Sequence, residues 1–260
     1  TSGDLGIFNL SSSGNLVLRG TRVENGRSTR YGGGIRTTNG SVLSLFDSAV
    51  VGSYAYYDGG GIDANGSTVS LVDSELSGNV ARGAGGGLAA RFASVTVSKS
   101  AIAGNLAIDC CGGGGGGGIV VKGGSVTLSD STIAGNGQTG VSALWNGRLS
   151  VSRTAVEDHN YGVRVSGGTI ALSASIVRSN QYGIASFHSS SAAITDTKVT
   201  DNAAVGIYVD ASSQGNAFSV TVVDSSINSN ARGVLAQGLV TLSLLRSTVH
   251  GNGLMGSSAS

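Results

Sequence analysis

The 260-residue sequence contains no proline, and aromatic residues make up only 5% of it. Without proline, every residue in a strand can donate its backbone N–H to a neighbouring strand, as the central strands of a sheet require. With so few aromatic rings, a core must be built from valine, isoleucine, leucine and alanine. Such a core suits thin stacked layers better than one large globular centre.

Charge is also scarce: charged residues make up 12% of the chain and the formal net charge is +1. There is no basic excess to bind phosphates, so nucleic acid is not an expected partner. No apolar run approaches the roughly 18 residues of a transmembrane helix, so no membrane span is expected in this chain. The first residues, Thr1 to Asp4, do not resemble a signal peptide, and this leaves the compartment open.

Repetition is the feature that the sequence has in abundance. One unit, Val126 to Val141, reads apolar-x-apolar-x-x-Ser/Thr-x-Ile/Val-x-x-Asn, followed by a loop and Gly-Ile/Val. The Ser/Thr position recurs at intervals of 21 to 31 residues, at Thr21, Ser48, Ser74, Ser100, Ser131, Thr154, Ser175, Thr197, Ser225 and Ser247. Seven of these ten units carry asparagine five residues later, at Asn79, Asn105, Asn136, Asn180, Asn202, Asn230 and Asn252.

Within each unit, three short runs alternate between apolar and polar residues, which is typical of strands with one buried face. A repeat of this length with three strands fits one coil of a solenoid. The sequence therefore predicts an all-β fold, a right-handed single-stranded parallel β-helix of about ten coils with three strands per coil. We expect one domain, residues 1–260, with a partial N-terminal coil (1–14), the repeats (15–252) and an irregular tail (253–260).

Equivalent residues of successive coils should stack about 4.8 Å apart, in columns. The asparagine column is then expected to form a ladder of hydrogen-bonded amides, in which His159 takes the place of asparagine. The column before the Ser/Thr position should form ion pairs, through Asp73, Lys99, Asp130 and Arg153, and through Asp224 and Arg246. Like-charged neighbours in this column repel each other unless a cation lies between them, so the sequence offers four candidate calcium ligands, Asp47, Asp73, Asp196 and Asp224.

Other residues suggest weaker hypotheses. Cys110 and Cys111 are adjacent, which allows a vicinal disulfide, two free thiols or intermolecular bonds. Tyr161 and Tyr182 should stack on neighbouring coils and are candidate glycan contacts, or simply a packed surface ladder. We find no motif for a catalytic nucleophile, a zinc site or a phosphate loop, and no cofactor is predicted.

A glycine pair before an apolar residue recurs in four units, as Gly33-Gly34-Ile35, Gly60-Gly61-Ile62, Gly86-Gly87-Leu88 and Gly117-Gly118-Ile119. With Ile102-Ala103-Gly104-Asn105, this pattern resembles the repeat of chlamydial polymorphic outer-membrane proteins, although Val, Ile or Leu stands where that family usually has Phe. The resemblance covers about residues 15 to 252. It implies a secreted or surface-displayed passenger domain, as in autotransporter adhesins.

These observations favour a non-enzymatic extracellular or cell-surface protein, such as an adhesin, a stalk or a filament component. Its expected partners are glycans, cell-surface proteins, or further copies of the chain associating end to end or laterally. One alternative is a polysaccharide-active lyase or glycoside hydrolase of the pectate-lyase-like class, which shares the coil architecture. A second alternative is an ice-binding protein, because small residues such as Thr127, Ser150 and Ala171 form a flat outward row.

Overall fold

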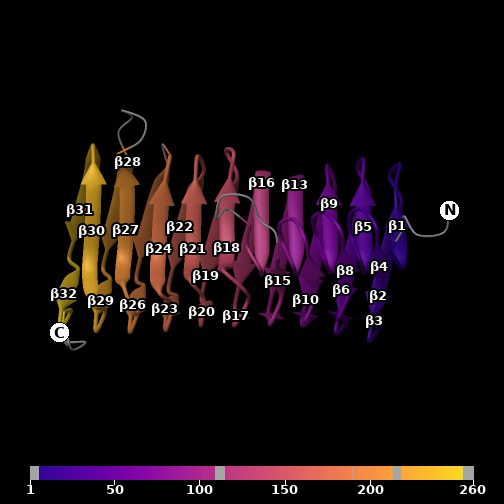
Figure 1. Cartoon of the computed structure of the whole chain (residues 1–260), viewed down its shortest axis with the longest axis horizontal. Coiled ribbons are helices and arrows are strands. Elements are labelled where there is room, and N and C mark those ends of the chain that lie inside the picture. Colours follow the sequence, from indigo (N-terminus) through magenta and orange to yellow (C-terminus); the bar gives the residue numbers. More distant parts are fainter. Residues whose placement is uncertain (1–5, 109–114, 189, 213–217, 254–260) are drawn as a thin grey trace.

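The computed structural model describes residues 6–108, 115–188, 190–212 and 218–253, and these form strands and turns without any helix. Every strand pair is parallel, and the strands stack side by side along one long axis (Figure 1). The predicted all-β parallel β-helix is confirmed. No described segment is a helix of the length and apolarity needed to cross a membrane.

Each coil contributes one strand to each of three long faces. We call the first two faces A1 and A2; they belong to one sheet because β13 (Leu88–Ser98) and β16 (Ile119–Ser129) run through both. The other A1 strands are β1 (Phe8–Leu10), β5 (Ile35–Thr38), β9 (Ile62–Asn65), β18 (Thr139–Leu144), β21 (Tyr161–Ser166), β24 (Tyr182–Phe187), β27 (Val205–Ala211) and β30 (Arg232–Gly238). The other A2 strands are β2 (Asn15–Arg19), β6 (Val42–Phe46), β10 (Thr68–Val72), β19 (Arg148–Ser152), β22 (Thr169–Ser173), β25 (Ser191–Thr195), β28 (Phe218–Val223) and β31 (Val240–Leu245).

The third face, sheet B, has ten strands, which are separated by nine intervals, so the chain makes about nine full turns. Its strands are β3 (Arg22–Glu24), β7 (Ala49–Val51), β11 (Glu75–Ser77), β14 (Ala101–Ala103), β17 (Thr132–Ala134), β20 (Ala155–Glu157), β23 (Ile176–Arg178), β26 (Lys198–Thr200), β29 (Ser226–Asn228) and β32 (Thr248–His250).

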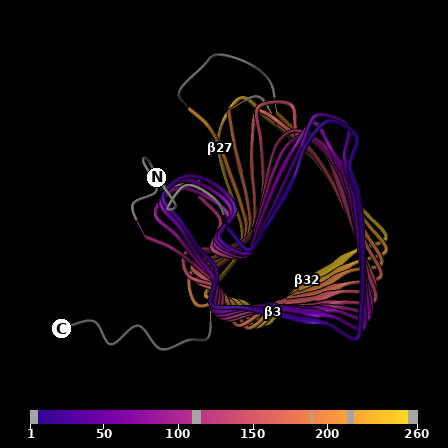
Figure 2. The same cartoon turned by 90° about the vertical axis from the view of Figure 1, so that its right-hand side faces the viewer.

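A fourth, short sheet was not predicted. Within the described residues, sheet C is confined to the first four coils, as β4 (Arg27–Ser28), β8 (Tyr54–Ala55), β12 (Val80–Ala81) and β15 (Leu106–Ala107). The segment between the asparagine ladder and the next core residue of A1 is longer in the early coils than in the later ones. Leu88 follows Asn79 by nine positions, whereas Ile184 follows Asn180 by only four. The extra residues of the early coils therefore fold outward as a lobe beside face A1, which Figure 2 shows as an indigo and purple bulge.

The bore is filled by columns of aliphatic side chains from the three long faces. Ile62 of A1, Leu71 of A2 and Leu76 of sheet B belong to one coil and are completely buried. Burying each such side chain stabilises the fold by about 1.5–3 kcal/mol. The outward residues of the same strands alternate with these, and they are the ones available for function.

The corner between A2 and sheet B has the same backbone turn in every coil. The ten residues that precede the Ser/Thr column all have a left-handed φ, between 45° and 56°. Aspartate and glycine tolerate this conformation better than most residues. Backbone geometry thus accounts for the recurrence of aspartate at the corner.

Two ladders of buried side chains join each coil to the next. At the corner, the Ser74 hydroxyl donates to the Val72 carbonyl (2.7 Å) and accepts the backbone N–H of Ser48 (3.2 Å). After sheet B, Asn105 Oδ1 accepts both the backbone N–H and the Nδ2–H of Asn79, at 3.0 Å each. The predicted asparagine ladder is confirmed.

His159 continues the asparagine ladder as predicted. Its Nε2 lies 3.2 Å from Asn136 Nδ2, and its Nδ1 lies 3.0 Å from Asn180 Oδ1. For the ladder to remain hydrogen-bonded, Nε2 must accept and Nδ1 must donate. The neutral imidazole with its proton on Nδ1 meets both requirements.

We expect Asn105→Ala to lower the free energy of unfolding by on the order of 3 kcal/mol, because it leaves buried donors of Asn79 and the Leu76 carbonyl without partners. Urea denaturation measures this loss. Asn15→Ala is the matched control, because Asn15 is exposed on β2, and it should change stability by no more than about 0.5 kcal/mol. Equal losses in the two variants would contradict the role of the ladder.

Candidate functional site

The outer face of A1 collects charged and aromatic side chains from distant parts of the chain. Strand register places its outward residues in two columns parallel to the axis. The first column contains Arg36, Asp63, Ala89, Val120, Ser142, Arg164, Ala185, Tyr208 and Leu235. The second contains Thr38, Asn65, Arg91, Lys122, Leu144, Ser166, Phe187, Asp210 and Gln237.

Four charged residues of these columns and Asp58 beside them form a group, which we call the Asp58–Asp63 cluster: Arg36, Asp58, Asp63, Arg91 and Lys122. Arg91 bridges the two carboxylates, with Nη1 2.9 Å from Asp58 Oδ2 and Nη2 2.8 Å from Asp63 Oδ1. Lys122 Nζ lies 3.0 Å from Asp58 Oδ2. Asp58 precedes β9 in the segment that returns from the lobe, and its Oδ1 accepts the backbone N–H of Ala84 (2.7 Å). The lobe and A1 together therefore hold this carboxylate in place.

The cluster has three cations and two carboxylates, and its pairing is incomplete. Asp63 is fully buried, and its Oδ2 lies 3.8 Å from Arg36 Nε. Neither of these two buried atoms has a hydrogen-bond partner in the part of the chain that the structure describes. Burial raises the pKa of Asp63 to about 6, outweighing the opposing attraction of Arg91 and Arg36.

Aromatic rings border the cations of the cluster. The Tyr31 ring centroid lies 4.4 Å from Arg91 Cζ and 5.5 Å from Arg36 Cζ, and the Trp145 centroid lies 5.5 Å from Lys122 Nζ. The three cationic side chains remain 15–26% exposed. Cations that solvent can reach, beside aromatic rings, suit a ligand with an anionic group and an apolar face.

Further along A1, four rings make a second group, the tyrosine cluster: Tyr161, Tyr182, Phe187 and Tyr208. Tyr161 and Tyr182 are stacked as predicted, with centroids 5.1 Å apart and planes inclined by 18°. Tyr208 lies 5.6 Å from both Tyr182 and Phe187. The role of Tyr161 and Tyr182 as glycan contacts stays a prediction.

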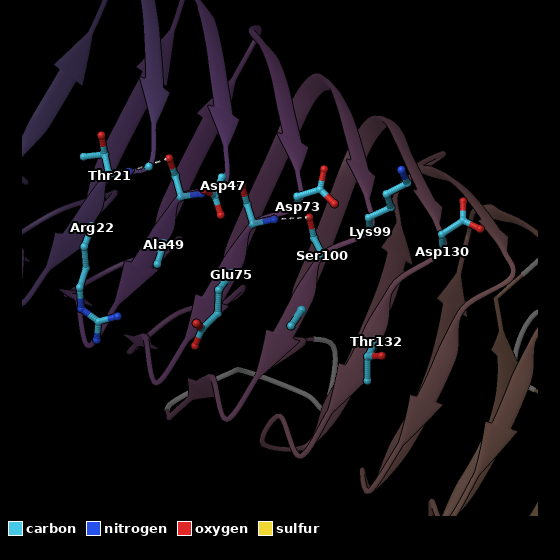
Figure 3. Close-up of a pocket in the computed structure, with 14 residues that line it drawn as sticks. Thr21, Arg22, Asp47, Ala49, Asp73, Glu75, Lys99, Ser100, Asp130 and Thr132 are labelled. Atoms are coloured by element: carbon cyan, nitrogen blue, oxygen red, sulfur yellow. Dashed lines mark hydrogen bonds between the residues drawn. The ribbon is translucent and has the colours of Figure 1, made fainter.

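The candidate calcium ligands lie elsewhere, at the corner between A2 and sheet B. Asp47 and Asp73 line a groove of about 560 Å³ with Glu75 and Lys99, and Figure 3 shows these side chains on successive coils. Asp196 and Asp224 line a separate groove of about 490 Å³ along the same corner, with Lys198, Arg246 and other residues. The structure thus brings the four aspartates together only as two pairs.

No set of three or more His, Cys, Asp or Glu side chains in the described ranges is arranged to hold a metal ion. Two of the predicted ion pairs of this column are formed. Arg153 binds Asp130 through Nε (2.6 Å) and Nη2 (2.8 Å), and Arg246 binds Asp224 in the same way (2.7 and 2.8 Å). Calcium binding stays a prediction. Cys110 and Cys111, the candidate disulfide, lie outside the described residues.

Sequence reasoning missed the Asp58–Asp63 cluster because it compared the outward residues of A2 and of the corner, and not those of A1. The sequence does contain a signal for this cluster. Arg36 and Asp63 each directly follow the buried isoleucine of a Gly-Gly-Ile segment, in a strand whose outward residues elsewhere include Ala89 and Val120. Charged residues at that outward position mark a face where polar groups gather.

The fold places the chain in a known class. The model of the right-handed β-helix region family matches residues 117–260, and the chain belongs to this family. No curated protein matches it by sequence.

Among solved structures, the chain resembles the periplasmic alginate epimerase AlgG, with a TM-score of 0.62 and 14% identity over 92% of this chain and 70% of AlgG. It also resembles the A-module of the mannuronan C-5 epimerase AlgE6 from Azotobacter vinelandii, with a TM-score of 0.54 and 13% identity over 87% of this chain and 62% of the module. At such identities the likeness is one of fold. The resemblance to polymorphic outer-membrane proteins stays a prediction.

Burial makes stability depend on pH in two opposing ways. The pKa of Asp63 is raised from 3.8 to about 6, so its contribution to stability is complete below pH 3.8 and is lost as pH rises through about 6. The pKa of His159 is lowered from 6.5 to about 4, mainly by burial, so its contribution is complete above pH 6.5 and is lost as pH falls through about 4.

Single variants should separate the two contributions. In His159→Asn, which leaves Asp63 in place, the free energy of unfolding should fall as pH rises from 3.8 to about 6. In Asp63→Asn, which leaves His159, it should rise between about 4 and 6.5. Urea denaturation over a pH series measures both slopes. Slopes of the same sign in the two variants would contradict the assignment.

Proposed function

We propose that this protein binds and modifies an acidic polysaccharide on the outer face of A1, and that the Asp58–Asp63 cluster holds a sugar carboxylate. The observation that carries the proposal is the surplus of partly exposed cations over carboxylates in this cluster, bordered by Tyr31 and Trp145. Guanidinium and ammonium groups donate charge-assisted hydrogen bonds to a carboxylate, and an aromatic ring packs against the apolar face of a pyranose.

The cluster has groups suited to assisting proton removal from a bound uronate. Removing the proton on the carbon next to a carboxylate spreads negative charge onto that carboxylate, and fixed cations stabilise this charge. Asp63 is fully buried and does not touch the sugar; its carboxylate holds Arg91 in place for this role. This proton removal is the step shared by epimerisation and eliminative cleavage of a uronate chain.

The structural neighbours give independent support, because they are epimerases of alginate and mannuronan. They favour the polysaccharide-active alternative over the adhesin, stalk or filament role that we first derived from the repeats. The AlgG neighbour is periplasmic, and we accordingly propose a cell-envelope or extracellular location. An ice-binding role rests on the outward row of A2 alone, and a thermal-hysteresis measurement tests it.

The proposal predicts selective binding of acidic polysaccharides, measured by titration calorimetry with alginate, polygalacturonate and neutral dextran. Lys122→Met removes one cation of the cluster and should weaken binding of the acidic chain about tenfold. Lys198→Met is the matched control, because it removes an exposed lysine from sheet B, and it should bind as the unaltered protein does. Equal affinity for dextran, or equal effects of the two variants, would contradict the proposal.

Turnover should accompany binding. In heavy water, hydrogen exchange at the sugar carbon next to the carboxylate reports proton removal, and nuclear magnetic resonance detects it. Ultraviolet absorbance of unsaturated ends reports cleavage. Selective binding with neither signal would favour the adhesin role instead.

A further inference from the structure

A hollow of about 370 Å³ opens beside the tyrosine cluster, near the C-terminal end of A1. The rings of Tyr182 and Tyr208 line it on one side, and Arg232 and Leu235 from the region of β30 line it on the other. Arg232 is exposed there, so a cation again stands beside aromatic rings, as it does in the Asp58–Asp63 cluster.

Polar groups that can bind hydroxyls surround the tyrosine cluster. The Tyr208 hydroxyl lies 3.1 Å from the Asp210 carboxylate and 3.3 Å from Gln237 Oε1. The Ser166 hydroxyl lies 2.9 Å from His188 Nδ1. Aromatic rings with adjacent donors and acceptors are the combination that a sugar ring requires, because its faces are apolar and its edge carries hydroxyls.

The tyrosine cluster is aligned with the Asp58–Asp63 cluster along the helix axis. Asp63 and Tyr208 belong to the same outward column and are six coils apart, roughly 29 Å at about 4.8 Å per coil. Figure 1 shows β9 and β27 in one row of strands, with β13, β16, β18, β21 and β24 between them. Between them this column holds Ala89, Val120, Ser142, Arg164 and Ala185, all of them buried. Arg164 is the one large side chain among these five, and it lies against the Phe187 ring, with its Cζ 4.9 Å from the ring centroid.

We infer that the tyrosine cluster and its hollow form a second sugar subsite for the same acidic polysaccharide, which lies along the axis and spans both clusters. This inference rests on the proposed function. In this subsite, Tyr182 and Tyr208 pack against a sugar ring, and Arg232 binds the carboxylate of a nearby uronate. A pyranose unit advances an extended chain by about one coil, so a tetrasaccharide is too short to reach both clusters and a decasaccharide is long enough.

A length series of uronate oligosaccharides, titrated by calorimetry, tests the inference. Affinity should rise about tenfold between the tetrasaccharide and the decasaccharide. In Tyr182→Leu, which removes the ring but keeps apolar packing, this rise should disappear while the tetrasaccharide binds as before. Phe46→Leu is the matched control, since it removes a ring from the outward side of A2 and should leave the rise intact. Thermal denaturation of both variants checks that they fold.

The possible failures are distinguishable. Affinity that does not depend on length, or a length effect that survives in Tyr182→Leu, would overturn the second subsite and leave the proposed function standing. If no acidic oligosaccharide of any length binds to the folded protein, the proposed function fails and this inference fails with it.

Discussion

The structure depends on one constraint, the register in which each coil lies on the next. A slip of one residue would turn every outward side chain into the bore. Two ladders oppose such a slip, since buried Ser/Thr hydroxyls, as of Ser74 and Ser100, and buried asparagine amides, as of Asn105 and Asn136, accept a backbone N–H from the preceding coil. An unpaired group there would cost about 1–3 kcal/mol. Register is therefore fixed at two points around each coil.

This register also builds the candidate site. The Asp58–Asp63 cluster draws Arg36, Asp63, Arg91 and Lys122 from four successive coils, and no local sequence motif joins them. The short sheet C adds the lobe, and the segment returning from the lobe brings Asp58 against the outer face of A1. A repetitive scaffold thus acquires a specific site through a few charged residues at outward positions, while the bore keeps its regular aliphatic columns.

The sequence was sufficient to predict the coils, because the repeated apolar, Ser/Thr and asparagine positions are the residues that fix register. It also predicted the stack of Tyr161 on Tyr182 and the place of His159. It did not predict sheet C, whose strands are only two residues long and carry no alternation. From the sequence, the corner aspartates, including Asp73, suggested calcium binding. The structure gives another reason for aspartate at these positions, because the backbone there has a left-handed φ. The Asp58–Asp63 cluster was missed because its residues are related only through the stacking of A1.

The most direct test of this account is an experimental structure of the protein with an acidic decasaccharide bound. The account predicts a sugar chain parallel to the helix axis on the outer face of A1, with one carboxylate against Arg36, Arg91 or Lys122 and a sugar ring on Tyr182. A chain bound in the corner groove beside Asp47, or lying across the axis, would contradict it.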